Sequence, residues 1–313
     1  MIRPKDIERA TALFGGIETF ERETGKTLRG IADPLRRNTL VFQLVESLHR
    51  ISYPRVMMRR PLGPDFADPD TPHFNPLLAA IMQLRAGNRD EAFWLVFLFV
   101  HFGQHARGQW RYSREVYGRL GQGGQWNWVT ISQDPPAFRA WLDANQAHLR
   151  RPGCGFGNHR KRESLDAHSP RGTGAAVETY VKWVLKTGSH DALIQSALSC
   201  ASYNGSQAFD VLYVSMNDVA SFGRTARFDY LTMVGKLGLA SISPGSPYLR
   251  GATGPLTGAR LLLNDDISVR TSWVALEQMF VELDGYLGVG MQALEDAICN
   301  WQKAPTKFRG FRG

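Results

Sequence analysis

Cysteine is scarce in this chain, and its three copies, Cys154, Cys200 and Cys299, are isolated from one another. No pair has the close spacing of a structural zinc site or an iron–sulfur cluster, so no metal and no cofactor is expected. His101 and His105 stand four apart, but Phe102 and Gly103 interrupt the pattern, and no third ligand follows. An odd number of cysteines argues against a disulfide framework and predicts a reducing, cytoplasmic environment.

Long apolar runs are also missing. The longest, residues 92–100, is too short to span a bilayer, and the first residues contain no signal-peptide core, so no membrane association is expected. Few segments alternate apolar and polar residues, whereas helical spacing recurs, so a mainly α fold with long loops is predicted. Helices are expected at residues 7–24, 33–48, 74–84, 90–102, 134–149, 177–185, 206–216, 226–237, 257–263, 273–286 and 291–301.

Two stretches lack helical periodicity and divide the chain. Residues 55–76 are rich in Pro and Asp, and residues 153–174 are rich in Gly, His and Arg. The first is interpreted as a separator, which gives an N-terminal helical extension with a Pro-rich loop over residues 1–72. The main helical domain then covers residues 73–313.

The charge balance favours a polyanionic partner. Lys and Arg outnumber Asp and Glu by 37 to 29, and aromatics make up 11% of the chain, with eight Trp. Arginine neutralises phosphates and aromatic faces stack on bases, so this combination indicates nucleic acid.

The second irregular stretch holds a dense group of polar side chains. Asn158 and His159 have the donors and acceptors to contact a base edge or a sugar, while Arg160 and Lys161 suit phosphates. Phe156 precedes them and offers an aromatic face. We predict that this segment binds the substrate.

Two further segments supply candidate substrate contacts. Arg224 and Arg227 are three residues apart near the start of a predicted helix, so they share a face close to the positive end of the helix dipole. A solvated Arg–Asp pair would explain them equally well. Tyr112 lies in an Arg-rich and aromatic segment and is a candidate contact to a substrate base.

The most informative segment combines a glycine-rich turn with acidic residues. Residues 251–255 read Gly-Ala-Thr-Gly-Pro and open an apolar helix, whose free N–H groups suit a phosphate. The helix is followed at once by Asp265 and Asp266, which predicts a carboxylate next to a phosphate seat. Either of the two could be the catalytic one. The expected DNA contacts of this segment are Gly251, Thr253, Gly254, Thr257, Gly258 and Arg270.

Three runs together resemble a known family. They are Phe-Gly-Asn-His-Arg-Lys at 156–161, Phe-Gly-Arg-Thr-Ala-Arg-Phe-Asp-Tyr-Leu at 222–231 and Ala-Thr-Gly-Pro-Leu-Thr-Gly-Ala-Arg at 252–260. They are similar to the third clade of the alpha-glutamyl/putrescinyl thymine pyrophosphorylase family, considered a relative of helix-hairpin-helix DNA glycosylases. The resemblance implies a two-lobed helical fold with a hairpin motif near residues 248–263. Residues 266–270 read Asp-Ile-Ser-Val-Arg and resemble the Asp-x-x-Val-x-Arg arrangement of that superfamily, with a shorter spacing. The resemblance therefore implies that Asp266 steadies the positive sugar as its glycosidic bond breaks, or activates water.

The same resemblance implies work on hypermodified pyrimidines of phage DNA. The clade is linked to phage defence by excision of modified bases, so we expect a monofunctional glycosylase that flips such a base, for example glucosylated hydroxymethylcytosine, and leaves an abasic site. The family name implies instead a transferase that displaces pyrophosphate from an activated 5-hydroxymethyl pyrimidine. A non-catalytic reader of modified DNA is the third alternative. The partner in each case is double-stranded DNA with modified bases, and the protein is expected to be a monomer.

Overall fold

The computed structural model describes residues 3–310 and is helical. It contains fourteen α-helices and no strand within this range, which confirms the predicted mainly α class. Two isolated bridges pair His105 with Gln109 and Ser164 with Gly172. Among these same residues, no helix is both long and apolar enough to cross a membrane.

The chain divides into two compact units. Unit 1 consists of the residues up to Tyr53 together with those from Pro244 onward, and unit 2 consists of Pro54–Ser243. This division differs from the boundary at residues 72 and 73 expected from the sequence. The reason is that the N-terminal helices pack against the C-terminal ones instead of forming a separate extension.

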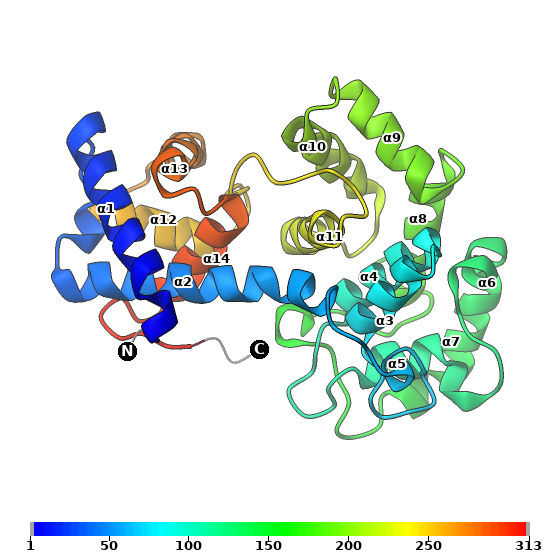
Figure 1. Ribbon diagram of the computed structural model, residues 1–313. Helices are drawn as coiled ribbons and strands as arrows, with labels where there is room; N and C mark the ends of the chain where they lie inside the picture. The colour runs from blue at the N-terminus through cyan, green and yellow to red at the C-terminus, as the bar shows by residue number, and fades with distance from the viewer. Residues whose placement is uncertain (1–2, 311–313) are drawn as a thin grey trace. The chain divides into compact units, whose positions relative to one another are not determined.

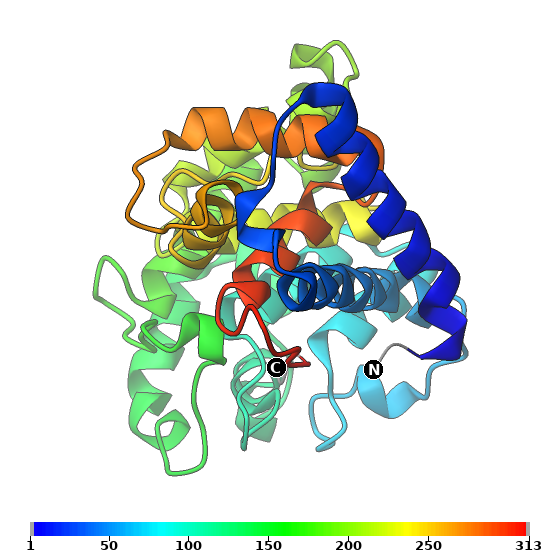
Figure 2. The same ribbon diagram turned by 90° about the vertical axis from the view of Figure 1, so that its left-hand side faces the viewer.

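Unit 1 has one continuous apolar core. It gathers Phe20, Leu44, Leu262, Phe280 and Trp301, each fully buried or nearly so, from both ends of the chain. Figures 1 and 2 show the orange helix α13 (Trp273–Leu287) beside the blue helix α1 (Ile7–Thr24). The elements of unit 1 are η1 (Pro4–Asp6), α1 (Ile7–Thr24), η2 (Arg29–Ile31), the first part of α2 (Pro34–Met57), α12 (Gly254–Asn264), α13 (Trp273–Leu287) and α14 (Met291–Trp301).

Unit 2 is built around helix α4 (Arg89–Phe102), whose residues Ala92–Leu98 are all buried. This helix packs against α3 and α11, which lie beside it in Figure 1. Its apolar residues face neighbours on every side, because α5, α6 and α9 also touch it. The other elements are η3 (Pro64–Phe66), α3 (Pro76–Arg85), α5 (Arg111–Tyr117), η4 (Arg119–Gly121), α6 (Trp128–Gln133), α7 (Pro135–Leu149), η5 (Asn158–Arg160), α8 (Thr173–Leu185), α9 (His190–Cys200), α10 (Gly205–Ser215), η6 (Met216–Asp218) and α11 (Arg224–Lys236).

Most predicted helices are present, with a few differences at their ends. Helix α2 was expected to stop at Leu48 but continues through Pro54 to Met57. Helices α5 and α6 were missed because they are only seven and six residues long, too short for a periodic signal. Helix α9 was missed as well, although its cap, the Ser189 side chain accepting from the Ala192 N–H at 3.1 Å, is a recognisable start signal.

Candidate active-site cleft and the predicted site residues

The predicted substrate-binding loop around η5 is anchored by Arg160. Only 7% of this residue is exposed. Its Nε donates to the Val100 carbonyl at 3.0 Å, and its guanidinium contacts the Asp229 carboxylate at 3.2 Å. Arg160 therefore ties the loop to α4 and α11, and its charge is directed inward instead of toward a DNA phosphate. Lys161, the next residue, is exposed and keeps the predicted phosphate role open.

The structure brings Phe156 and Tyr112 together. Their rings meet edge to face with centroids 5.2 Å apart, and Phe156 also stacks on Phe102 at 5.6 Å. Tyr112 is 7% exposed, so its ring belongs mainly to the apolar packing beneath the loop. Asn158 and His159 lie on the exposed side of the same turn. The base-contacting role predicted for these two residues is compatible with that position.

Arg224 and Arg227 both lie in the first turn of α11, as predicted. The Arg227 guanidinium lies over the Tyr213 ring at 4.3 Å, donates to the Tyr213 carbonyl at 3.1 Å and reaches the Asn217 side chain. It thereby joins α11 to the end of α10. The Arg224 guanidinium lies 4.7 Å from the centre of the Phe228 ring on the same helix.

The glycine-rich turn precedes α12 in unit 1. Gly251 is exposed and has φ of +76°, a conformation that favours glycine. Thr253 caps the helix without a side-chain hydrogen bond, and its carbonyl accepts from the Thr257 hydroxyl at 2.9 Å. No side chain of the turn therefore occupies the first N–H groups of α12, as a phosphate seat requires.

Gly254 and Gly258 also serve helix packing. A Cβ on Gly258 would lie 2.4 Å from the Ile298 carbonyl oxygen, and one on Gly254 would lie 2.7 Å from the Cys299 sulfur. Both glycines face α14 and allow the two helices to pack closely. Helix packing accounts for the lack of a side chain at both positions, and their contact to DNA stays a prediction.

Asp265 and Asp266 follow the opposite end of α12. The helix has eleven residues, which at 1.5 Å per residue separates the turn from the acids by about 16 Å. The expected carboxylate next to a phosphate seat is therefore not formed within α12. Asp265 pairs with Arg36, whereas Asp266 is exposed and accepts from the Ser268 N–H at 2.8 Å. Hydrogen bonds from Ser268 hold the pKa of Asp266 below its usual value, so it is ionised. Arg270 is exposed nearby in sequence.

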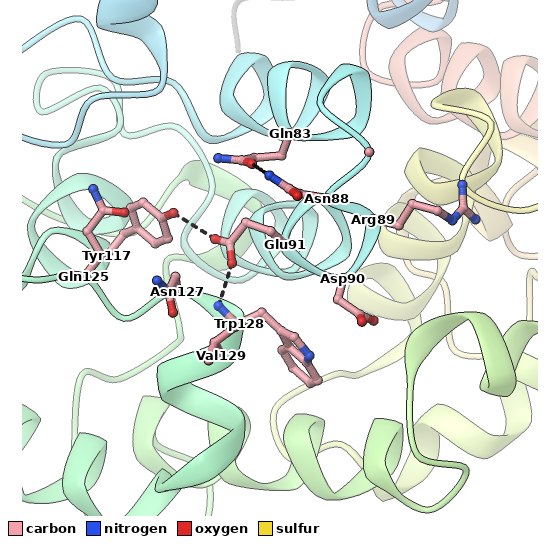
Figure 3. Close-up of a pocket in the computed structure, with 11 residues that line it drawn as sticks. Gln83, Asn88, Arg89, Asp90, Glu91, Tyr117, Gln125, Asn127, Trp128 and Val129 are labelled. Carbon is pink, nitrogen blue, oxygen red and sulfur yellow. Dashed lines mark hydrogen bonds between the residues drawn. The ribbon is translucent and has the colours of Figure 1, made fainter.

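A cleft of about 500 Å³ opens at the N-terminus of α4 in unit 2, and sequence reasoning missed it. Two adjacent carboxyl groups, Asp90 and Glu91, belong to its wall, and Arg89 points away from Glu91 (Figure 3). Most of the other side chains that line it are amides and aromatics. The lining residues are Gln83, Gly87, Asn88, Arg89, Asp90, Glu91, Tyr117, Gln125, Asn127, Trp128 and Val129.

Glu91 is held by two donors. The Tyr117 hydroxyl donates to one carboxyl oxygen at 2.8 Å, and the Trp128 N–H donates to the other at 2.6 Å (Figure 3). Burial raises the pKa of Glu91 and outweighs these hydrogen bonds, which act in the opposite direction. Glu91 therefore retains its proton to higher pH than a solvated glutamate does.

Asp90 has the opposite environment. Its Oδ1 accepts from Nδ1 of His190 at 2.6 Å and from the His190 backbone N–H at 3.2 Å. The hydrogen bond from His190 is the main reason that the pKa of Asp90 is lowered. Its side chain remains 43% exposed, so the carboxylate is partly open to solvent at the edge of the cleft.

Behind Asp90, a chain of hydrogen bonds runs into the interior of unit 2. His190 is 1% exposed, and burial lowers its pKa, so the ring is neutral and carries its proton on Nδ1 beside Asp90. Its Nε2 then accepts from the Tyr180 hydroxyl at 2.7 Å, and the Tyr230 hydroxyl donates to Tyr180 at 2.9 Å. This chain fixes the position of Asp90 from the inside.

The cleft therefore joins two neighbouring carboxyl groups whose pKa values are shifted in opposite directions. Such a pair can supply a proton donor and an anionic stabiliser in one site. Gln83, Asn88 and Asn127 can supply donors and acceptors to a polar ligand. As for metals, no three His, Cys, Asp or Glu side chains within residues 3–310 are grouped so as to hold an ion.

Comparison with known families accounts for most of the chain. A family model described as alpha-glutamyl/putrescinyl thymine pyrophosphorylase clade 3 matches residues 35–313. The chain belongs to this family. Membership confirms the resemblance found in the sequence and implies chemistry on modified bases of DNA. No curated protein and no solved structure was found to match.

Proposed function

We propose that this pyrophosphorylase-family member is a DNA glycosylase that excises a modified pyrimidine, with Asp90 and Glu91 as its catalytic pair. The observation that carries the proposal is the split environment of these two carboxyl groups at one cleft. Cleavage of an N-glycosidic bond needs an anion near the developing sugar cation and a proton for the departing base.

In the proposed reaction, the bond between C1′ of the sugar and N1 of the pyrimidine breaks, and its electrons leave with the base. The Asp90 carboxylate stabilises the positive charge that develops on the sugar. The protonated Glu91 transfers its proton to the departing base. Water then adds to C1′, one of its protons returns to a carboxylate, and an abasic site remains.

The cleft volume of about 500 Å³ suits one flipped nucleotide with a substituent. The amides of Gln83, Asn88, Gln125 and Asn127 are the proposed contacts to the base edge. Asn158 and His159 follow Gly157, which is joined to the other end of α4, about 16 Å from Glu91, so they remain proposed contacts to DNA outside the cleft. Lys161 and the turn at Gly251 remain proposed contacts to the DNA backbone.

The second candidate function is the transferase that the family name describes, in which an amine displaces pyrophosphate from an activated pyrimidine. The two reactions leave different products. Excision releases a free base and creates alkali-labile sites, whereas displacement keeps the base attached and increases its mass.

The test incubates the protein with phage DNA carrying glucosylated hydroxymethylcytosine, beside unmodified DNA. Alkaline gels and mass spectrometry follow the products. Free modified base together with breaks confined to the modified DNA supports the glycosylase. A mass gain after incubation with activated DNA and an amine supports the transferase. Tight binding without any product supports a reader.

Variants then locate the chemistry. We expect Asp90→Asn and Glu91→Gln each to reduce excision by about 10²- to 10³-fold, the loss typical of a removed transition-state contact. Asp266→Asn and Asp265→Asn test the carboxylates predicted from the sequence. The matched control is Asp218→Asn, which alters an exposed carboxylate of unit 2 that pairs with Lys186. Full activity of the first two variants with loss in Asp266→Asn would move the centre to the loop after α12.

A further inference from the structure

A second feature of unit 2 is an excess of arginine around one buried carboxylate. Glu115 is 6% exposed, and its Oε1 contacts Arg111 at 2.7 Å, Arg151 at 2.6 Å and Arg114 at 3.6 Å. One carboxylate neutralises one guanidinium, so this group carries two surplus positive charges.

The surroundings add to this surplus. Residues 103–114 and 148–162 together contain eight Arg and Lys and no Asp or Glu. Of these eight, the buried Arg160 is matched by Asp229 and by the nearby Glu163. Asp166 lies close enough to Arg150 for its pKa to be lowered by it. Within residues 3–310, the acidic side chain that contacts other cations of the two segments is Glu115.

The two basic segments lie against each other. The Gly157 N–H donates to the Phe102 carbonyl at 2.7 Å, which joins the ends of the segments. A Cβ on Gly108 would lie 2.6 Å from the Gly153 carbonyl oxygen, so the backbones approach closely at a second point. Cations that are about 40 residues apart in sequence are thus brought onto adjoining segments. We call this set the arginine patch: Arg107, Arg111, Arg114, Arg150, Arg151, Lys161 and Arg162.

We propose that the arginine patch is the surface of unit 2 that binds the sugar–phosphate backbone of DNA. Like charges held together without counter-charges repel one another, so the arrangement is best stabilised by an anionic partner. Guanidinium groups that share one carboxylate oxygen keep N–H donors for further acceptors, and their fork matches a phosphate. Arg111, Arg114 and Arg151 are 20%, 26% and 37% exposed, so Glu115 fixes their inner edges while their outer edges face solvent.

This inference rests on the proposed function, because that function supplies the DNA. The arginine patch is tested separately, by measuring the binding of DNA instead of catalysis. The probe is a fluorescent, unmodified duplex of about twenty base pairs, and anisotropy gives the affinity over a range of salt concentrations. Each phosphate contact adds about 0.9 to the slope of log K against log salt.

The test variant is the double substitution Arg114→Gln and Arg151→Gln. We expect the slope to decrease by about 1.8 and the affinity at 0.1 M salt to decrease roughly 60-fold, since two phosphate contacts are lost. The matched control is Lys182→Gln with Lys186→Gln, which removes two exposed, paired cations of the same unit. The control has the same net charge as the test variant and should retain the wild-type slope.

Two further variants exclude a purely structural explanation. Arg151→Lys keeps the positive charge, so this variant should retain most of the wild-type slope of log K against log salt. Arg107→Gln removes an exposed cation outside the Glu115 contacts, so it should leave the melting temperature unchanged and lower the slope by about 0.9.

An equal decrease in the test variant and its control would overturn the proposal, because net charge alone would then explain binding. An unchanged slope in the folded Arg107→Gln protein and in the folded double variant would overturn it as well. If the protein excises modified bases but the variants keep the wild-type slope, only the proposed role of the arginine patch is contradicted. A patch confirmed by its slopes, in a protein that forms no product, would contradict only the proposed glycosylase.

Discussion

The direction of the hydrogen bonds behind Asp90 predicts that substitutions of two tyrosines will destabilise the protein to different extents. Tyr180 is the central member: because neutral His190 carries its proton on Nδ1 beside Asp90, Tyr180 donates to Nε2 of His190 and therefore accepts from Tyr230. Tyr180→Phe would leave both the His190 Nε2 and the Tyr230 hydroxyl without a partner in the interior. Tyr230→Phe would leave neither, because Tyr180 still donates to His190.

The magnitudes follow from this difference. A buried polar group left without a partner costs about 1–3 kcal/mol, so two of them in Tyr180→Phe cost about 2–6 kcal/mol. Loss of a hydrogen bond without an orphaned group, as in Tyr230→Phe, costs about 0.5–1.5 kcal/mol. The double variant removes one orphaned hydroxyl, so it should be more stable than the sum of the single changes predicts.

The assay is denaturant unfolding followed by tryptophan fluorescence, to which unit 2 contributes six of the eight Trp residues. Excision activity of each variant is measured at the same time. Tyr180→Phe should also reduce activity, because His190 loses the contact that orients it toward Asp90. Equal destabilisation by the two single substitutions would refute the direction of the chain and the neutral state of His190.

Two other predictions follow from the cleft and from the core of unit 1. The raised pKa of Glu91 means that the folded protein holds this proton more tightly than the unfolded chain does. The proton therefore stabilises the folded state below the unfolded pKa of 4.5, and this stabilisation is lost as pH rises through the folded pKa. Glu91→Gln should remove this component from the pH profile of the unfolding free energy. The decline of the excision rate at alkaline pH should disappear with it. An unchanged pH profile of the unfolding free energy would argue against a raised pKa. In unit 1, Gly258→Ala should lower the unfolding free energy by about 1–3 kcal/mol, because the added Cβ would lie 2.4 Å from the Ile298 carbonyl oxygen. The unfolding free energy is measured by calorimetry. No loss would contradict the close packing of α12 on α14.

Much of the fold could be predicted from the sequence because helical signals are local. The bounds of α1 and α14 agree with the expected ones, and the Asp134 cap before two prolines correctly marked the start of α7. Pairing between distant segments has no such local signal. The joining of the first helices with residues after Pro244 depends on matching apolar faces, and neither face alone specifies its partner.

The candidate site shows the same limit more clearly. Asp90 and Glu91 stand in the first turn of α4, where acidic residues are common because they complement the helix dipole. Nothing local distinguishes them from ordinary acids at a helix start. Their environments are created by His190, which lies 100 residues away from Asp90, and by Tyr117 and Trp128, which follow Glu91 by 26 and 37 residues.

The glycine-rich turn illustrates the converse case, in which a strong local pattern also has a structural explanation. Gly254 and Gly258 were assigned to DNA because glycine permits close approach of a backbone. The structure shows that the approaching group is α14, through Ile298 and Cys299. A glycine in a sequence thus indicates that another group approaches the backbone closely, while only the packing identifies that group. The arginine patch differs from these glycines, because apolar packing does not compensate surplus charge and so does not explain it.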